Sequence, residues 1–70
     1  MDMDIPQLAT LLHETAEQHD AFEKASPPHD WWDWYAPYLQ ARLDGESPAA
    51  ATEIADLYMA EAKQVIAART

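Results

Sequence analysis

The chain has 70 residues, of which 13 are acidic and four are lysine or arginine, so its formal charge is -9. A negative field of this size repels phosphate backbones and anionic lipid surfaces, which argues against nucleic acid and membrane as partners. A chain this short hides only about 60% of its unfolded surface, which leaves few apolar side chains for an enzyme cleft. Composition therefore favours a non-enzymatic module, and no cofactor is expected.

Targeting and redox signals are sparse. The absence of cysteine excludes disulfide bonds and thiolate metal sites. The segment Met1 to Gln7 has neither the basic region nor the apolar run of a signal peptide. No stretch reaches the ~20 apolar residues that a membrane span needs. We therefore expect a cytoplasmic protein with one helical domain over residues 1–70.

A first helix is predicted over about residues 5–24. Asp4 can accept from first-turn amides, Pro6 is tolerated at an early helical position, and Gln7 has the capping-box spacing. The helix should stop before the prolines of the linker, because a residue preceding proline is disfavoured in the α region. Helical spacing gives an apolar face of Ile5, Leu8, Leu11, Leu12, Thr15, Ala16, His19 and Phe22. The opposite face carries His13, Glu14, Glu17, Gln18, Asp20 and Lys24.

A second helix is predicted over about residues 31–43. Asp30 is its expected cap, and Asp44-Gly45 ends it because glycine adopts the left-handed conformation cheaply. Pro37 should bend the helix and face solvent. The apolar arc sweeps roughly 200° around the axis; it consists of Trp31, Trp32, Trp34, Tyr35, Ala36, Tyr38, Leu39 and Leu43. So wide an arc needs two neighbours, which are the other two helices or one of them and a partner.

A third helix is predicted over about residues 48–68, capped by Ser47 and begun by Pro48. Its expected buried side consists of Ala51, Ile54, Leu57, Tyr58, Ala62, Val65 and Ile66. Its outer side consists of Thr52, Glu53, Asp56, Lys63 and Gln64. The predicted fold is all-α, a three-helix bundle with a proline-kinked second helix.

Two polar groups interrupt the apolar faces of the first two helices. His19 can meet Glu23 one turn on, and His29 from the linker could complete a metal or acid–base site. We favour the alternative of a core histidine satisfied by a carboxylate or a tyrosine hydroxyl, because this spacing is a weak metal signal. Arg42 lies within the apolar arc of the predicted second helix.

A buried charge needs a partner, so an ion pair of Arg42 with Glu61 or Glu23 is expected, with contact to another protein as the alternative.

The aromatic cluster of the second helix is the most distinctive feature of the sequence, and it consists of Trp31, Trp32, Trp34, Tyr35 and Tyr38. Each ring can bury some 150–250 Å², and a small chain cannot hide them all. We expect Trp31, Trp34 and Tyr38 in the core and Trp32 as an exposed anchor for a partner. The single glycine, Gly45, is explained as a helix stop, so a nucleotide-binding loop is not supported, and no hydrolase motif is present.

Two segments carry a family resemblance. They are His19-Asp20-Ala21-Phe22-Glu23-Lys24 and Pro28-His29-Asp30-Trp31-Trp32-Asp33-Trp34-Tyr35-Ala36-Pro37-Tyr38. Over about residues 13–60 the chain resembles a short helical module of bacterial proteins described as bleomycin-resistance or glyoxalase-like. The resemblance implies a bacterial accessory module, brings no catalytic activity with it, and singles out His19, Glu23, Trp31, Trp34, Tyr35 and Tyr38. The chain has no room for the βαββ metal-binding domain of glyoxalase-like enzymes.

The sequence thus leads to two hypotheses of function. The first is an accessory module that self-associates as a dimer, or docks on a partner protein, through its aromatic surface. The alternative is a module that binds a small ligand or a metal through His19, Glu23 and His29.

Overall fold

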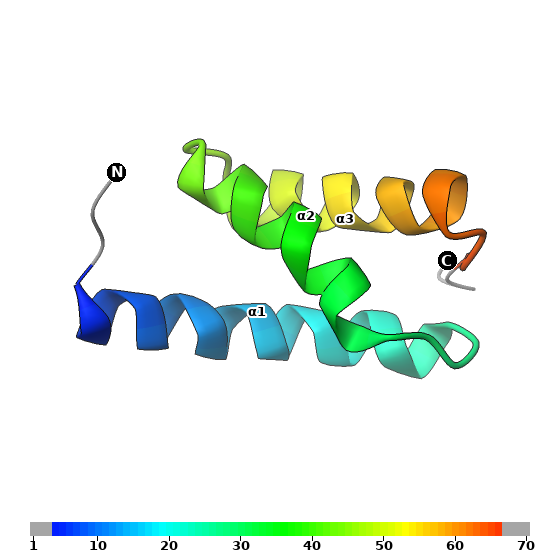
Figure 1. The fold of residues 1–70 in the computed structure, drawn as a ribbon, viewed down its shortest axis with the longest axis horizontal. Coiled ribbons are helices and arrows are strands. Elements are labelled where there is room, and N and C mark those ends of the chain that lie inside the picture. The colour runs from blue at the N-terminus through cyan, green and yellow to red at the C-terminus, as the bar shows by residue number, and fades with distance from the viewer. Residues whose placement is uncertain (1–3, 67–70) are drawn as a thin grey trace.

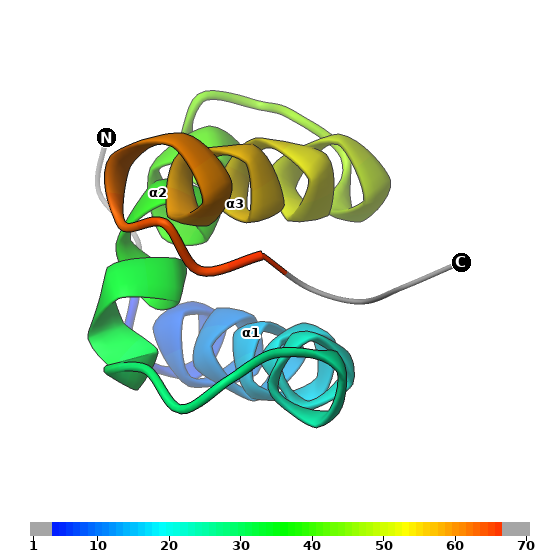
Figure 2. The ribbon, with the colours of Figure 1, turned by 90° about the vertical axis from the view of Figure 1, so that its right-hand side faces the viewer.

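The computed structural model describes residues 4–66, which form three helices and no β-strand: α1 (Ile5–Ala25), α2 (Trp31–Leu43) and α3 (Pro48–Ala62). α2 is the central helix. It packs extensively on α3 and crosses α1, whereas α1 and α3 contact each other little (Figure 1). Figure 2 shows α1 and α3 one above the other, joined on one side by α2. The predicted all-α three-helix bundle is confirmed, and so is the place of α2 between two neighbours.

The helix starts follow the local capping residues. The Asp4 carboxylate accepts the Gln7 backbone N–H at 2.9 Å, and the Gln7 side chain accepts the Asp4 N–H at 3.3 Å, which completes a capping box. The Ser47 hydroxyl accepts the Ala50 N–H at 3.1 Å at the start of α3. Asp30 occupies the N-cap position of α2, but its side chain makes no capping hydrogen bond.

Gly45 ends α2 as predicted. Its φ is +97°, and the backbone forms the two hydrogen bonds of a Schellman motif: Glu46 N–H to Ala41 carbonyl and Gly45 N–H to Arg42 carbonyl, each 3.0 Å long. Pro37 lies inside α2. It is half-buried instead of solvent-facing, and the bend predicted there stays a prediction.

The register of α3 differs from the prediction. Its buried residues are Ala51, Ala55 and Met59, whereas Ile54, Leu57 and Tyr58 are exposed. The large rings of Trp34 and Tyr38 fill the space between the helices, so α3 presents small alanines to α2. The rest of the core consists of Leu11, Thr15, His19, Phe22 and Ala41. On α1, Ile5, Leu8, Leu12 and Ala16 are exposed, so only half of its predicted face is buried.

α3 ends at Ala62 and not near residue 68 as predicted. Gln64 adopts the left-handed conformation with φ of +58°, and the Val65 N–H donates to the Met59 carbonyl at 2.9 Å. This turn lets Val65 pack half-buried against the core, while Ile66 is exposed. Residues 67 and 68 of the predicted helix lie outside the described residues. Among the described helices, none is long and apolar enough to cross a membrane.

Candidate functional site

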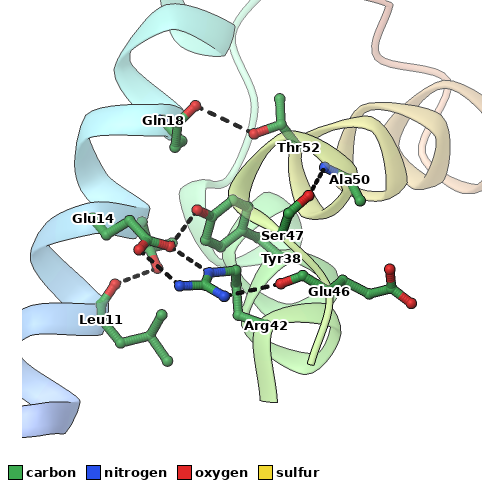
Figure 3. Close-up of polar contacts among 10 residues, drawn as sticks. Leu11, Glu14, Gln18, Tyr38, Arg42, Glu46, Ser47, Ala50 and Thr52 are labelled. Carbon is green, nitrogen blue, oxygen red and sulfur yellow. Dashed lines mark hydrogen bonds and ion pairs between the residues drawn. The ribbon is translucent and has the colours of Figure 1, made fainter. Parts of the chain in front are cut away.

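A three-residue network joins the middle of α1 to the second half of α2 (Figure 3). Arg42 donates from Nε to Oε2 of Glu14 at 2.7 Å and from Nη2 to Oε1 at 3.1 Å, so the pair is bidentate. The Tyr38 hydroxyl donates to Oε2 of Glu14 at 2.5 Å. Arg42 also donates from Nη1 to the Glu46 carbonyl at 2.9 Å. Every oxygen of the Glu14 carboxylate is thereby occupied.

The electrostatics of this network hold Glu14 ionised. The hydrogen bond from Arg42 lowers the pKa of Glu14, against the opposing effect of burial. Burial, helped by the Glu14 carboxylate, raises the pKa of Tyr38 to about 12. The Arg42 and Glu14 side chains are only 27% and 26% exposed. Their bidentate contact is therefore a structural tie between α1 and α2.

The intramolecular ion pair expected for Arg42 exists, but the partner is Glu14 and not Glu61 or Glu23. Glu61 is exposed on α3. The sequence prediction missed Glu14 because it placed this residue on the outer face of α1. The available signal was its position one turn after Leu11, which puts it at the edge of the buried face.

A second polar cluster joins α1 to the linker before α2. Nε2 of His19 lies 3.0 Å from Nε2 of His29. Nδ1 of His29 lies 2.9 Å from the Pro27 carbonyl and 3.3 Å from the Ser26 hydroxyl. Nδ1 of His19 lies 3.5 Å from Oε2 of Glu23. The structure thus brings together His19, Glu23 and His29, the three residues predicted as a polar core or ligand site.

The two imidazoles sit among aromatic rings. His19 contacts Trp34 and Tyr35 at centroid distances of 5.5 and 5.3 Å, and His29 contacts Phe22 at 4.9 Å. Burial lowers the pKa of His19, although the Glu23 carboxylate acts in the opposite direction. The predicted burial of His19 is confirmed, whereas the side chain of its partner Glu23 is 66% exposed.

A hollow of about 510 Å³ opens beside the histidine pair. It is lined by Glu23, Ser26, Pro27, Pro28, His29 and Trp31. Within residues 4–66, no group of three or more histidine, cysteine, aspartate or glutamate side chains is arranged to hold a metal ion. The His19–His29 contact supplies two imidazole nitrogens, and His29 lines the hollow.

The aromatic residues of α2 divide into a buried and an exposed set. Trp34 and Tyr38 are fully buried, as predicted. Their rings are stacked, and the Trp34 indole N–H donates to Oδ1 of Asp56 at 2.9 Å. Trp32 is 53% exposed, as predicted, and its role as an anchor for a partner stays a prediction.

Trp31 was predicted in the core but is also 53% exposed. It occupies the first position of α2, where it packs edge-on against Trp32 and the half-buried Tyr35.

One side of α2 leaves an apolar stripe uncovered. The stripe follows the spacing i, i+4, i+7 and i+11, and consists of Trp32, Ala36, Leu39 and Leu43. Leu39 is half-buried and the other three are exposed. We call this surface the α2 stripe. A helix of 13 residues thus presents apolar groups at both ends and the middle of one face.

Comparison with known proteins finds no matching family model, no similar curated protein and no similar solved structure. The resemblance of the two aromatic segments to the bleomycin-resistance or glyoxalase-like module therefore stays a prediction.

Proposed function

We propose that the chain is a non-enzymatic interaction module that docks on another protein through the α2 stripe. The observation that carries this proposal is the exposure of Trp32 and Leu43 at opposite ends of one helix face. Anchors at i, i+4, i+7 and i+11 are the pattern by which an amphipathic helix enters an apolar groove. Tryptophan is also among the residues enriched at binding hot spots.

The charge around the stripe favours a partner with a basic rim. Exposed carboxylates flank it: Asp30 lies before its start, and Asp44 and Glu46 lie after its end. The described part of the chain contains three lysine or arginine residues, and each is in an ion pair: Lys24 with Asp20, Arg42 with Glu14, and Lys63 with Asp33. A second copy of the chain would bring the same acidic rim, so a basic protein surface is the better match.

Site-specific photo-crosslinking tests the proposal. A photoreactive amino acid replaces the exposed Gln40, beside the stripe, in one variant and the exposed Glu17 on α1 in a matched control. We expect the first variant, but not the control, to crosslink one cellular protein. Binding of that protein, once purified, should weaken at least tenfold with Trp32→Ser, because loss of a hot-spot anchor costs about 2 kcal/mol or more. Added salt should also weaken it by screening.

Two outcomes would overturn this reading. Crosslinking of the chain to itself, together with association that salt tightens, would identify a second copy as the occupant. Equal crosslinking from positions 17 and 40, or none from position 40, would show that the α2 stripe is not a docking surface.

A further inference from the structure

The Pro27 carbonyl determines which nitrogen of His29 carries the proton. A carbonyl oxygen only accepts, so Nδ1 of His29, at 2.9 Å, must donate to it. Neutral His29 therefore presents a lone pair at Nε2. Across the 3.0 Å contact, Nε2 of His19 must then be the donor.

This proton arrangement leaves His19 and Glu23 mismatched. With its proton on Nε2, neutral His19 presents a lone pair at Nδ1, 3.5 Å from a carboxylate oxygen of Glu23 that also only accepts. Moving the His19 proton from Nε2 to Nδ1 turns this contact into a hydrogen bond. The same move leaves two lone pairs facing each other at the two Nε2 atoms, which are stabilised together only if a cation lies between them.

We infer that the His19–His29 pair binds one divalent transition-metal ion of the kind that prefers imidazole, such as Zn²⁺, through both Nε2 atoms. Two nitrogens bound about 2.0–2.1 Å from one ion lie roughly 2.9–3.4 Å apart, from right-angled to tetrahedral geometry. The observed separation of 3.0 Å falls within this range. At this separation the angle between the two metal–nitrogen bonds is close to a right angle, so both rings must rotate out of their present contact to aim their lone pairs at one ion.

The atoms behind the two rings support this assignment. Metal-bound histidines typically donate their second ring N–H to a carboxylate or a backbone carbonyl, which fixes the tautomer. Here the Glu23 carboxylate stands behind His19 and the Pro27 carbonyl behind His29. Both kinds of outer acceptor are thus in place before any ion is bound.

The hollow lined by Glu23, Ser26 and His29 lies beside the His29 member of the pair, whereas His19 is buried behind it. Two protein ligands leave at least two positions of a tetrahedral ion for water or a small anionic group. A site of this composition binds an ion reversibly and keeps it accessible to a further ligand. It is independent of the α2 stripe, whose residues do not line this hollow.

Calorimetric titration of the full chain with Zn²⁺ tests the inference. We expect one ion per chain, with affinity at least tenfold lower in His29→Gln and about tenfold lower in Glu23→Gln, the usual size of an outer-acceptor effect. His13→Gln is the matched control. His13 and Glu17 form the same i,i+4 pair with a 3.5 Å contact, but on an exposed surface where no second imidazole is in contact in the described structure. Its affinity should equal that of the unchanged chain.

Nitrogen NMR of the unchanged chain gives a second reading that does not depend on how a variant folds. Zn²⁺ should shift the Nε2 signals of His19 and His29, move the His19 proton to Nδ1, and leave His13 unaffected. The inference is overturned if Zn²⁺ does not bind, if it binds equally well to His29→Gln, if His13→Gln removes it, or if one ion is taken up per two chains.

Discussion

Two polar clusters connect α1 to the rest of the molecule. They differ in how completely their hydrogen-bond donors and acceptors are paired. In the Glu14–Tyr38–Arg42 network, three strong donor contacts satisfy one carboxylate. In the His19–His29 cluster, one nitrogen faces a carboxylate with no proton to share when His19 is neutral. A fully matched network contributes stability and little else. A cluster with an unmatched acceptor can gain a hydrogen bond when a ligand changes its protonation, so the linker end of α1 is the place to test for ion binding, apart from docking on the α2 stripe.

Breaking the matched network should have the largest effect. Arg42→Ala leaves the Glu14 carboxylate three-quarters buried without its cation, which we expect to cost about 2 kcal/mol of unfolding free energy. For a domain of this size, that corresponds to a fall in Tm of about 8–16 °C. The control is Lys24→Ala, which removes an exposed ion pair and should cost less than about 0.5 kcal/mol. Equal effects in the two variants would mean that the network contributes no more than a surface pair.

Tyr38→Phe should be the next largest change, at about 1.5 kcal/mol, because it removes a hydrogen bond to a charged group and keeps the ring. It should also remove an alkaline sensitivity. The folded-state pKa of Tyr38 is raised from 10.0 to about 12, so the unfolded chain loses this proton first. The contribution of protonated Tyr38 to stability is therefore fully present below pH 10 and falls as pH rises toward 12.

Denaturant unfolding between pH 9 and 12 measures this effect. A decline in Tyr38→Phe as steep as in the unchanged chain would contradict the assignment to Tyr38.

As the pH falls, the two clusters should lose their contributions to stability in different pH ranges. The pKa of buried His19 is lowered below 6.5, with Glu23, His29 and Asp20 as the charged groups that act on it, so the unfolded chain binds a proton first as pH falls. The contribution of neutral His19 to stability is present above about pH 6.5 and decreases below it. The pKa of Glu14 is lowered below 4.5, so its contribution is lost only in stronger acid.

Thermal unfolding from pH 7 to pH 3 follows both windows. His19→Leu should remove the loss that begins near pH 6.5 and keep the loss below pH 4.5. If His19→Leu retains the higher-pH loss, His19 is not the group responsible.

Glu23→Ala should have the smallest effect. Because the Glu23 side chain is 66% exposed and its contact with His19 is 3.5 Å long, we expect less than about 0.5 kcal/mol in the absence of metal. Chemical denaturation at pH 7 gives the value. A loss above about 1 kcal/mol would show that neutral His19 depends on Glu23, and that the mismatch described above does not exist.

The parts of the fold that depend on neighbouring residues in the chain were predictable. Asp4, Gly45 and Ser47 act on backbone groups within a few residues. As expected, Asp4 and Ser47 begin helices and Gly45 ends one. The register of α3 was not predictable in the same way, because the apolar pattern alone predicts that Ile54 is buried in preference to Ala55. The aromatic rings of α2 reverse that order because they share the core with the small side chains of Ala51 and Ala55 and with Met59, while Ile54 stays exposed.

The candidate site follows the same division. A histidine on the apolar face of a helix predicted a buried His19, but its meeting with His29 depends on how the Pro27-Pro28 linker folds back. Glu14 was missed because a glutamate at the edge of a buried face looks solvated until its partner on another helix is known. Trp31 was misplaced because the apolar arc of α2 gives no sign of where neighbouring helices stop.

The different environments of the three indoles give the chain fluorescent reporters of three different events. Trp34 is fully buried with its N–H bonded to Asp56, whereas Trp31 and Trp32 are half exposed to water. Fluorescence emission from Trp34 should respond to unfolding. A soluble collisional quencher should quench Trp31 and Trp32 before Trp34. Protection of the Trp32 signal alone would reveal docking on the α2 stripe, and a change confined to Trp31 would reveal a ligand in the hollow beside His29.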